Sequence, residues 1–340
     1  MMKIVRFFIQ YKFHSIERLY NNHNKGLEMK NLYLAGMLCL SVNLTVVAAE
    51  QNNIKAQEVS QSCLSEHWSK SKLIALKASD FKVDNPRERE QLALQMLNCL
   101  AHPDPELRDG VAFESLSKWL RGNLLKTEIA IQMLNTLEPV LNTKIDDVNG
   151  IYQPFVALVL AELARVDRKS PYLTEYQRSS LLKEAITYLI YQKDYRGFDN
   201  KLGWRHGIAH SADLLLQLSL NPKLNKVQLD SILNALSTQI KANNAHFYIY
   251  GESKRLAMPL VYIFLRKEHT AKDWQQWIEK VIVPLPLASW SEAYNSQESL
   301  AKLHNLQSFL YSLYAIIKNS KNEVLVSMIP DLEKAIKIVR

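Results

Sequence analysis

The chain has 340 residues, 47% of them hydrophobic and only nine of them glycine, which is enough apolar material for one large or two ordinary domains. Its formal net charge is +8, but half of that excess lies in the first 49 residues, where six Lys and Arg residues stand against two Glu. The remainder is mildly basic and has no run of Lys or Arg interleaved with aromatic residues, so nucleic acid is not expected as a partner.

Residues 29–49 have the pattern of a secretory signal peptide. Lys30 supplies the positive charge, the stretch from Leu32 to Val47 is apolar, and two alanines precede the expected cleavage point after Ala49. We therefore predict a periplasmic or secreted protein with no membrane span in the mature chain. The alternative keeps the apolar stretch as an N-terminal membrane anchor. Residues 1–28 fit neither role, and we interpret them as an upstream extension of the reading frame or a disordered segment.

From about residue 53 onward, apolar residues recur at helical spacing between short breaks rich in Pro, Gly, Asn and Asp. The clearest apolar stripes lie in residues 155–166, 182–189 and 229–240. Helices of about 15–20 residues joined by short turns pack as antiparallel neighbours. We therefore predict an all-α fold, either an α-solenoid of HEAT-like helical hairpins (an α/α superhelix) or an irregular helical bundle. No linker divides the chain, so residues 50–340 are predicted to form a single domain.

The chain has two cysteines besides Cys39, which lies in the apolar N-terminal stretch. In an oxidising compartment, Cys63 and Cys99 could form a disulfide that stabilises the fold by about 3–4 kcal/mol through loop entropy. The alternative is two separate buried thiols. Spacing leaves both open, because a disulfide requires the two Cα atoms to lie within about 7 Å.

One polar stretch interrupts the helical pattern. Residues 194–217 read DYRGFDNKLGWRHGIAHSADLLLQ, a turn with two glycines followed by a helix that is predicted to start near Trp204. On this helix His206, His210 and Asp213 share one stripe, while the other positions are nearly all apolar, as in a buried helix. Burying polar side chains without partners costs about 1–3 kcal/mol each. The stripe therefore needs a polar neighbour, ordered water, a metal or a cleft.

Three interpretations of this stripe remain open. Two histidines one turn apart could share a divalent metal such as zinc, with Asp213 or Glu252 as a third ligand, although no HExxH glutamate is present. The same groups could instead form an internal polar network, with Glu252 in the first turn of another helix. The third interpretation is a recognition cleft for an anionic or sugar-like ligand or a peptide, with the candidate residues Asp194, Arg196, Trp204, His206, His210, Asp213, Glu252 and Arg255.

Common catalytic motifs are missing from the sequence. It has no G-x-S-x-G, P-loop, G-x-G-x-x-G or Cys-His arrangement, so the usual hydrolase, NTPase and dehydrogenase classes are not indicated. The leading hypothesis is a non-catalytic periplasmic binding or scaffolding protein without a cofactor, whose ligand or protein partner is unknown. The alternative is a metal-dependent hydrolase or lyase that uses His206, His210 and Asp213. The sequence does not decide whether the protein is an enzyme.

The chain resembles the bacterial domain-of-unknown-function family DUF2785. The resemblance extends over about residues 87–285 and is carried by residues 105–120, 155–224 and 251–266. The resemblance implies a helical domain with no assigned activity, cofactor or catalytic residues. The chain departs from the family pattern at Leu202, where members have glycine, and at 152–154, where members have a basic residue followed by a hydroxyl residue. The matching positions are Asp194, Arg196, Gly197, Gly203, Trp204, His206, His210, Asp213, Glu252 and Arg255.

Overall fold

The structure is a computed structural model that describes residues 54–340. The described residues form one compact unit, and the hydrophobic core lies within it. The predictions for residues 1–28 and for the signal segment 29–49 lie outside the described residues. Within the described part, no helix is long and apolar enough to cross a membrane.

The described chain is almost entirely helical, which confirms the predicted all-α class. The narrower assignment to a HEAT-like solenoid stays a prediction. In chain order the elements are β1 (Ile54–Lys55), α2 (Ala56–Gln61), α3 (Lys70–Ala78), α4 (Pro86–Cys99), α5 (Pro105–Leu107), the π-helix η1 (Arg108–Phe113), α6 (Glu114–Arg121), α7 (Thr127–Leu137), the 3-10 helix η2 (Glu138–Leu141), β2 (Ile145–Asp146), α8 (Tyr152–Lys169), α9 (Glu175–Tyr191), β3 (Phe198–Asp199), β4 (Gly203–Trp204), α10 (Gly207–Ser219), α11 (Lys226–Gln239), α12 (Glu252–Leu265), α13 (Ala271–Ile282), the 3-10 helix η3 (Trp290–Asn295), α14 (Gln297–Lys318), α15 (Glu323–Val326) and α16 (Ile329–Ile338).

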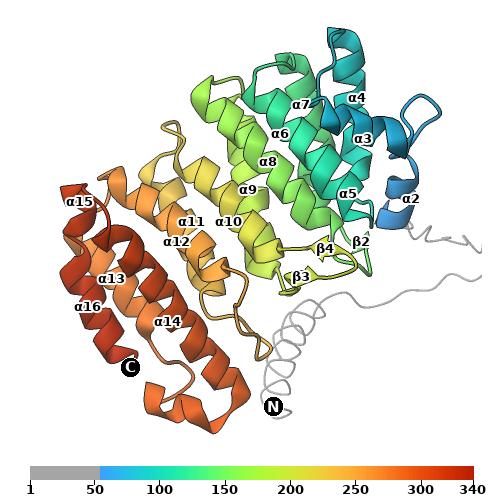
Figure 1. Cartoon of the computed structure of the whole chain (residues 1–340). Helices are drawn as coiled ribbons and strands as arrows, with labels where there is room; N and C mark the ends of the chain where they lie inside the picture. Colours follow the sequence, from blue (N-terminus) through green and yellow to red (C-terminus); the bar gives the residue numbers. More distant parts are fainter. Residues whose placement is uncertain (1–53) are drawn as a thin grey trace, which may run out of the picture. The chain divides into compact units, whose positions relative to one another are not determined.

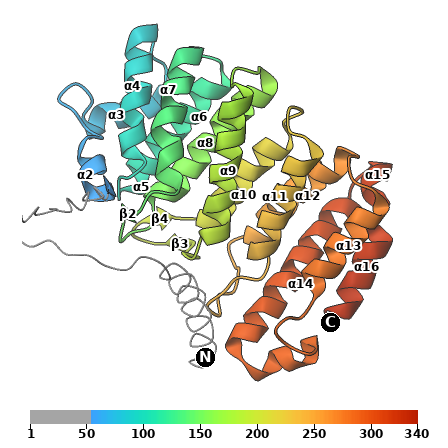
Figure 2. The same cartoon turned by 180° about the vertical axis from the view of Figure 1, so that it is seen from behind.

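The long helices are stacked side by side. Helices α6, α8, α10, α12 and α14 follow one another in one row, each in contact with the next, while α9 and α11 pack together behind α10 (Figures 1 and 2). The three predicted apolar stripes lie on α8, α9 and α11. Because α8 and α10 have neighbours on several sides, most of their side chains are buried.

Side-chain caps fix where several of these helices begin. Thr174 caps α9, Asn225 caps α11 and Thr270 caps α13, each in a reciprocal bond with the residue three positions later. At the end of α8, the buried carboxylate of Asp167 accepts bonds at 2.7 and 3.1 Å from the guanidinium of Arg178 on α9. The row of helices is therefore pinned by polar bonds as well as by the apolar core.

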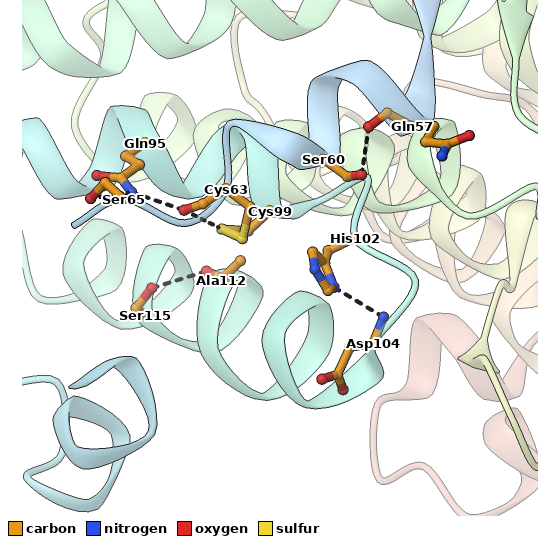
Figure 3. Close-up of a disulfide and its surroundings, with 10 residues drawn as sticks. All are labelled: Gln57, Ser60, Cys63, Ser65, Gln95, Cys99, His102, Asp104, Ala112 and Ser115. Atoms are coloured by element: carbon orange, nitrogen blue, oxygen red, sulfur yellow. Dashed lines mark hydrogen bonds between the residues drawn. A yellow bond between two sulfur atoms is a disulfide. The ribbon is translucent and has the colours of Figure 1, made fainter. Parts of the chain in front are cut away.

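Cys63 and Cys99 form a disulfide, with their Cα atoms 4.5 Å apart (Figure 3). Both residues are fully buried, and the side-chain amide of Gln95 donates to the carbonyl oxygen of Cys63 at 2.8 Å. The bond ties the segment after α2 to the last residue of α4. A second attachment is the parallel pairing of β1 with β2, in which Ile54 lies opposite Ile145. The start of the described chain is therefore held at two points.

Candidate functional site

The polar stretch folds as a short hairpin that leads into α10. Strands β3 and β4 pair antiparallel, with Phe198 opposite Trp204. The carboxylate of Asp199 closes the turn by accepting the backbone N–H of Leu202 at 2.7 Å, and it also pairs with the buried Arg205. The Leu202 amide and the Arg205 guanidinium together lower the pKa of Asp199 to about 2. An ion pair and backbone hydrogen bonds therefore fix this short hairpin.

Helix α10 begins at Gly207, so the predicted start near Trp204 was three residues too early. The reason is that Trp204 belongs to a strand, which local helical periodicity does not reveal. His206 is the N-cap residue and has φ +59°, in the left-handed region. Six other non-glycine residues among those described also have a positive φ, so this conformation points to a functional site only together with the other features of His206. The carbonyl oxygen of His206 still accepts the N–H of His210 at 2.9 Å.

The predicted stripe is only partly accessible, because most of helix α10 is buried. In α10, only Asp213, Leu216 and Gln217 keep partial exposure. His210 is 7% exposed, its Nδ1 donates to the carbonyl oxygen of Pro154 at 3.1 Å, and burial lowers its pKa to about 3. The imidazole is therefore neutral at neutral pH and belongs to the interior.

His206 differs from His210 because part of its hydrogen-bonding capacity is unused. Its Nδ1 is buried and has no hydrogen-bond partner within residues 54–340. Burial, together with the nearby guanidinium of Arg255, lowers the pKa of His206 to about 4. A buried polar atom of this kind costs about 1–3 kcal/mol when it stays unpaired. His206 is thus both strained and unsatisfied.

Two partners from neighbouring helices satisfy Asp213 and Gln217, which lies about one turn further along α10. Asp213 forms an ion pair with Arg255 of α12, whose side chain is 49% exposed, and burial raises the pKa of Asp213. Gln217 accepts the Nε–H of Arg168 on α8 at 2.8 Å. Asp213 and Gln217 therefore belong to an internal polar network with Arg255 and Arg168. The unsatisfied end is the one at His206.

Aromatic rings surround that end. Trp204 stacks on His206 with ring centroids 4.2 Å apart, and the ring of Tyr250 meets Trp204 edge-on at 5.8 Å. Trp204 is 38% exposed. We call Trp204, His206 and Tyr250 the aromatic shelf. Gly197 makes room for it, because a Cβ at this position would lie 2.0 Å from the ring of Tyr250.

Sequence reasoning did not identify Arg108 as a site residue, although its side chain binds the backbone of the hairpin. Its fully buried guanidinium donates to the carbonyl oxygens of Leu202 at 2.6 Å and Trp204 at 3.2 Å, and lies 4.6 Å from the ring centroid of Phe155. It also pairs with Asp109, whose pKa burial raises to about 6. Both residues lie in the π-helix η1, an element often found at functional sites. The only local signal was an Arg-Asp pair in an otherwise apolar segment.

Three predicted site residues have other roles. Asp194 binds Arg196 in a two-oxygen ion pair, with Nε and Nη2 at 2.8 and 2.6 Å, and Nη1 of Arg196 lies 3.4 Å from the carbonyl oxygen of Val148. They hold the loop before α8, which also lines a cavity of about 370 Å³ next to Lys55. Glu252 is 2% exposed and accepts the N–H of Tyr250 at 2.8 Å, which is a capping role at the start of α12.

The geometry does not assemble the predicted metal ligands. Among the described residues, no group of three His, Cys, Asp or Glu side chains could hold a metal ion. The ring centroids of His206 and His210 lie 5.7 Å apart, while Asp213 is engaged by Arg255 and Glu252 is buried at the start of α12. The structure therefore brings Trp204, His206, Asp213 and Arg255 together as an aromatic and polar surface, with His210 buried beneath it.

The fold and the site define an all-helical protein whose central buried helix exposes one polar edge beneath an aromatic shelf. Comparison with protein families adds the second step. The model described as "Protein of unknown function (DUF2785)" matches residues 141–315, and the chain belongs to this family, as its resemblance predicted. The matched region includes the shelf and the stripe but excludes Arg108 and the disulfide. No curated protein and no solved structure matches the chain.

Proposed function

We propose that the chain is a non-catalytic binding protein whose small, sugar-like or anionic ligand lies on the aromatic shelf and reaches Arg255. The observation that carries the proposal is His206, a left-handed residue with an unpartnered buried nitrogen, stacked on the exposed Trp204. Strain and an unpaired polar atom persist where a site needs them. The 38% exposed Trp204 offers aromatic surface to a sugar, and the half-exposed Arg255 offers donors for an acidic group.

We further propose that the protein works outside the cytoplasm. Residues 29–49 have the pattern of a signal peptide, with cleavage after Ala49. The disulfide between Cys63 and Cys99 supports this location, since such bonds persist in oxidising compartments. A periplasmic or secreted location agrees with both features.

A binding role suits the ionisable groups better than catalysis does. Asp213 is neutralised by Arg255, and both histidines of the stripe have lowered pKa values that keep them uncharged at neutral pH. Neither histidine therefore has a pKa near neutral pH, where a histidine general base works best. Because no group of three metal ligands is found within residues 54–340, no specific observation favours the metal-dependent hydrolase or lyase.

The test is titration of residues 50–340 with neutral and acidic monosaccharides, followed by calorimetry and by tryptophan fluorescence. The key variant is His206→Asn, because Asn tolerates the left-handed conformation and should keep the fold. We expect binding of at least one sugar, with a loss of about tenfold or more in affinity in His206→Asn, equivalent to about 1.4 kcal/mol. Tyr176→Ala, at an 82% exposed position on α9, is the control.

Two results would reject the proposal. One is no saturable binding of any sugar of the panel by the wild-type protein. The other is binding that His206→Asn leaves unchanged, which would place the ligand away from the shelf.

A further inference from the structure

Four large apolar side chains are exposed in the three segments that lead into α8, α10 and α12. Two of them lie in the paired strands of the hairpin, and one of these, Trp204, also belongs to the aromatic shelf. Val148 is 85% exposed, Ile249 69%, Phe198 42% and Trp204 38%. They lie before α8, in the hairpin before α10, and before α12. We call these four residues the loop-tip patch. Single exposed apolar residues are ordinary on protein surfaces, but a group of them marks an interaction site.

Specific contacts show that these loops are neighbours. Arg196, next to the hairpin, lies with Nη1 3.4 Å from the carbonyl oxygen of Val148. The hydroxyl of Tyr250, which follows Ile249, donates to the carbonyl oxygen of Phe198 at 3.3 Å. The ring centroids of Phe198 and Trp204 are 5.0 Å apart. The loops before α8 and α10 can be followed in Figure 1 near the labels β2, β3 and β4.

The charges around the patch favour an anionic partner. Lys193, Lys201 and Lys254 are exposed beside its loops. Two nearby carboxylates are already engaged, Asp194 by Arg196 and Asp199 by Arg205. Two carboxylates that pair with none of these cations count against the three lysines: the exposed Asp146 and the partly exposed Asp147, which accepts backbone N–H groups of residues 150–152. The surroundings of the patch therefore carry an excess of positive charge.

The chain enters the described unit at the same place. Strand β1 pairs with β2 so that Lys55 lies opposite Asp146, two positions before Val148.

We propose that the loop-tip patch docks on the surface of an anionic phospholipid bilayer. Val148, Phe198 and Ile249 would enter the boundary between headgroups and acyl chains, and Trp204 would lie at the headgroup level that aromatic residues prefer. The lysines would bind the lipid headgroups, each worth about 1 kcal/mol near an anionic surface. The bonds that fix the hairpin also hold its tips in place, which limits the ordering cost of docking.

The test is co-sedimentation of residues 50–340 with vesicles of phosphatidylcholine alone or mixed with phosphatidylglycerol. We expect binding to the mixed vesicles, a blue shift of tryptophan emission that is absent in Trp204→Phe, and weakening by salt. The variant Val148→Ser/Ile249→Ser should lower the partition coefficient about tenfold or more. Neither of these two residues belongs to the aromatic shelf.

A closely matched control lies at the other end of the helices. Tyr176 and Val227 are 82% and 72% exposed, near the starts of α9 and α11. Tyr176 is about 22 Å along α9 from its last residue, Tyr191, since a helix rises about 1.5 Å per residue. The variant Tyr176→Ser/Val227→Ser should bind vesicles as the wild-type protein does.

The proposal is overturned if the wild-type protein does not bind the mixed vesicles, or if the patch and control variants lose binding equally. Capture of a protein partner by the patch, without vesicle binding, would also overturn it. The outcome is separable from that of the proposed ligand site. His206→Asn should keep vesicle binding and lose sugar binding, while Val148→Ser/Ile249→Ser should do the reverse.

Discussion

Protonation of His210 should destabilise the fold in acid, by an amount that follows from its burial. Burial lowers the pKa of His210 to about 3 in the folded protein, from an ordinary value of 6.5. Between these values the unfolded chain binds a proton that the folded chain does not. The free energy of unfolding therefore falls as the pH drops below 6.5, and this loss continues until the pH nears 3. With about 1.36 kcal/mol per pH unit, acidification to about pH 4.5 removes roughly 2–3 kcal/mol through this residue.

Urea unfolding of the wild-type protein and of His210→Gln, each at about pH 7 and about pH 4.5, isolates this contribution. Carboxylates and His206 titrate in both proteins. The difference between the two decreases in the free energy of unfolding therefore reports the contribution of His210. We expect the wild-type drop to be larger by about 2–3 kcal/mol. The variant starts from a lower value at neutral pH, by about 1 kcal/mol, because the bond to Pro154 is lost or lengthened. Equal drops in the two proteins would refute the reasoning, since they would mean that His210 is protonated in the folded protein without cost.

Two further changes test the framework around the site. Cys99→Ser removes the disulfide, which joins residues 36 positions apart, and should lower the free energy of unfolding measured in urea by about 3–4 kcal/mol. A count of free thiols in denatured, unreduced wild-type residues 50–340 should give zero, and any other count would contradict the disulfide. Gly203→Ala places a Cβ 3.0 Å from that of Pro105 at a φ of +69°, so its thermal unfolding should show a loss of about 1–3 kcal/mol, whereas an unchanged melting temperature would show that the hairpin adapts freely.

Helical periodicity was sufficient to predict most of the fold. The stripes at 155–166, 182–189 and 229–240 lie on α8, α9 and α11, because apolar spacing along a helix records which side meets the core. The burial of α10 followed from the same logic, since its sequence is apolar on nearly every side. These properties depend on neighbours within a few turns, which the sequence contains directly.

The details of the site depend on distant partners, and the sequence does not contain them locally. The guanidinium of Arg108 binds the carbonyl oxygen of Leu202, 94 positions further along the chain. The left-handed backbone of His206 follows from the strand pairing of the hairpin just before it, which shifts the helix start. Asp194 and Glu252 had the residue types of ligands, but they act in a loop clamp and in a helix cap. Carboxylates serve structural and binding roles with the same chemistry, so only their partners distinguish the two.

The position of Arg108 also shows that the site needs more of the chain than the family match covers. The match begins at residue 141, yet the carbonyl oxygens of Leu202 and Trp204 receive their bonds from a side chain before that point. Helix η1, which carries Arg108, packs against α4, and α4 is held by the disulfide at Cys99. Removing a buried charged donor leaves its acceptors without partners, at a cost of about 1–3 kcal/mol each. A fragment limited to the matched region would therefore keep the residues of the shelf while losing the support that orients Trp204.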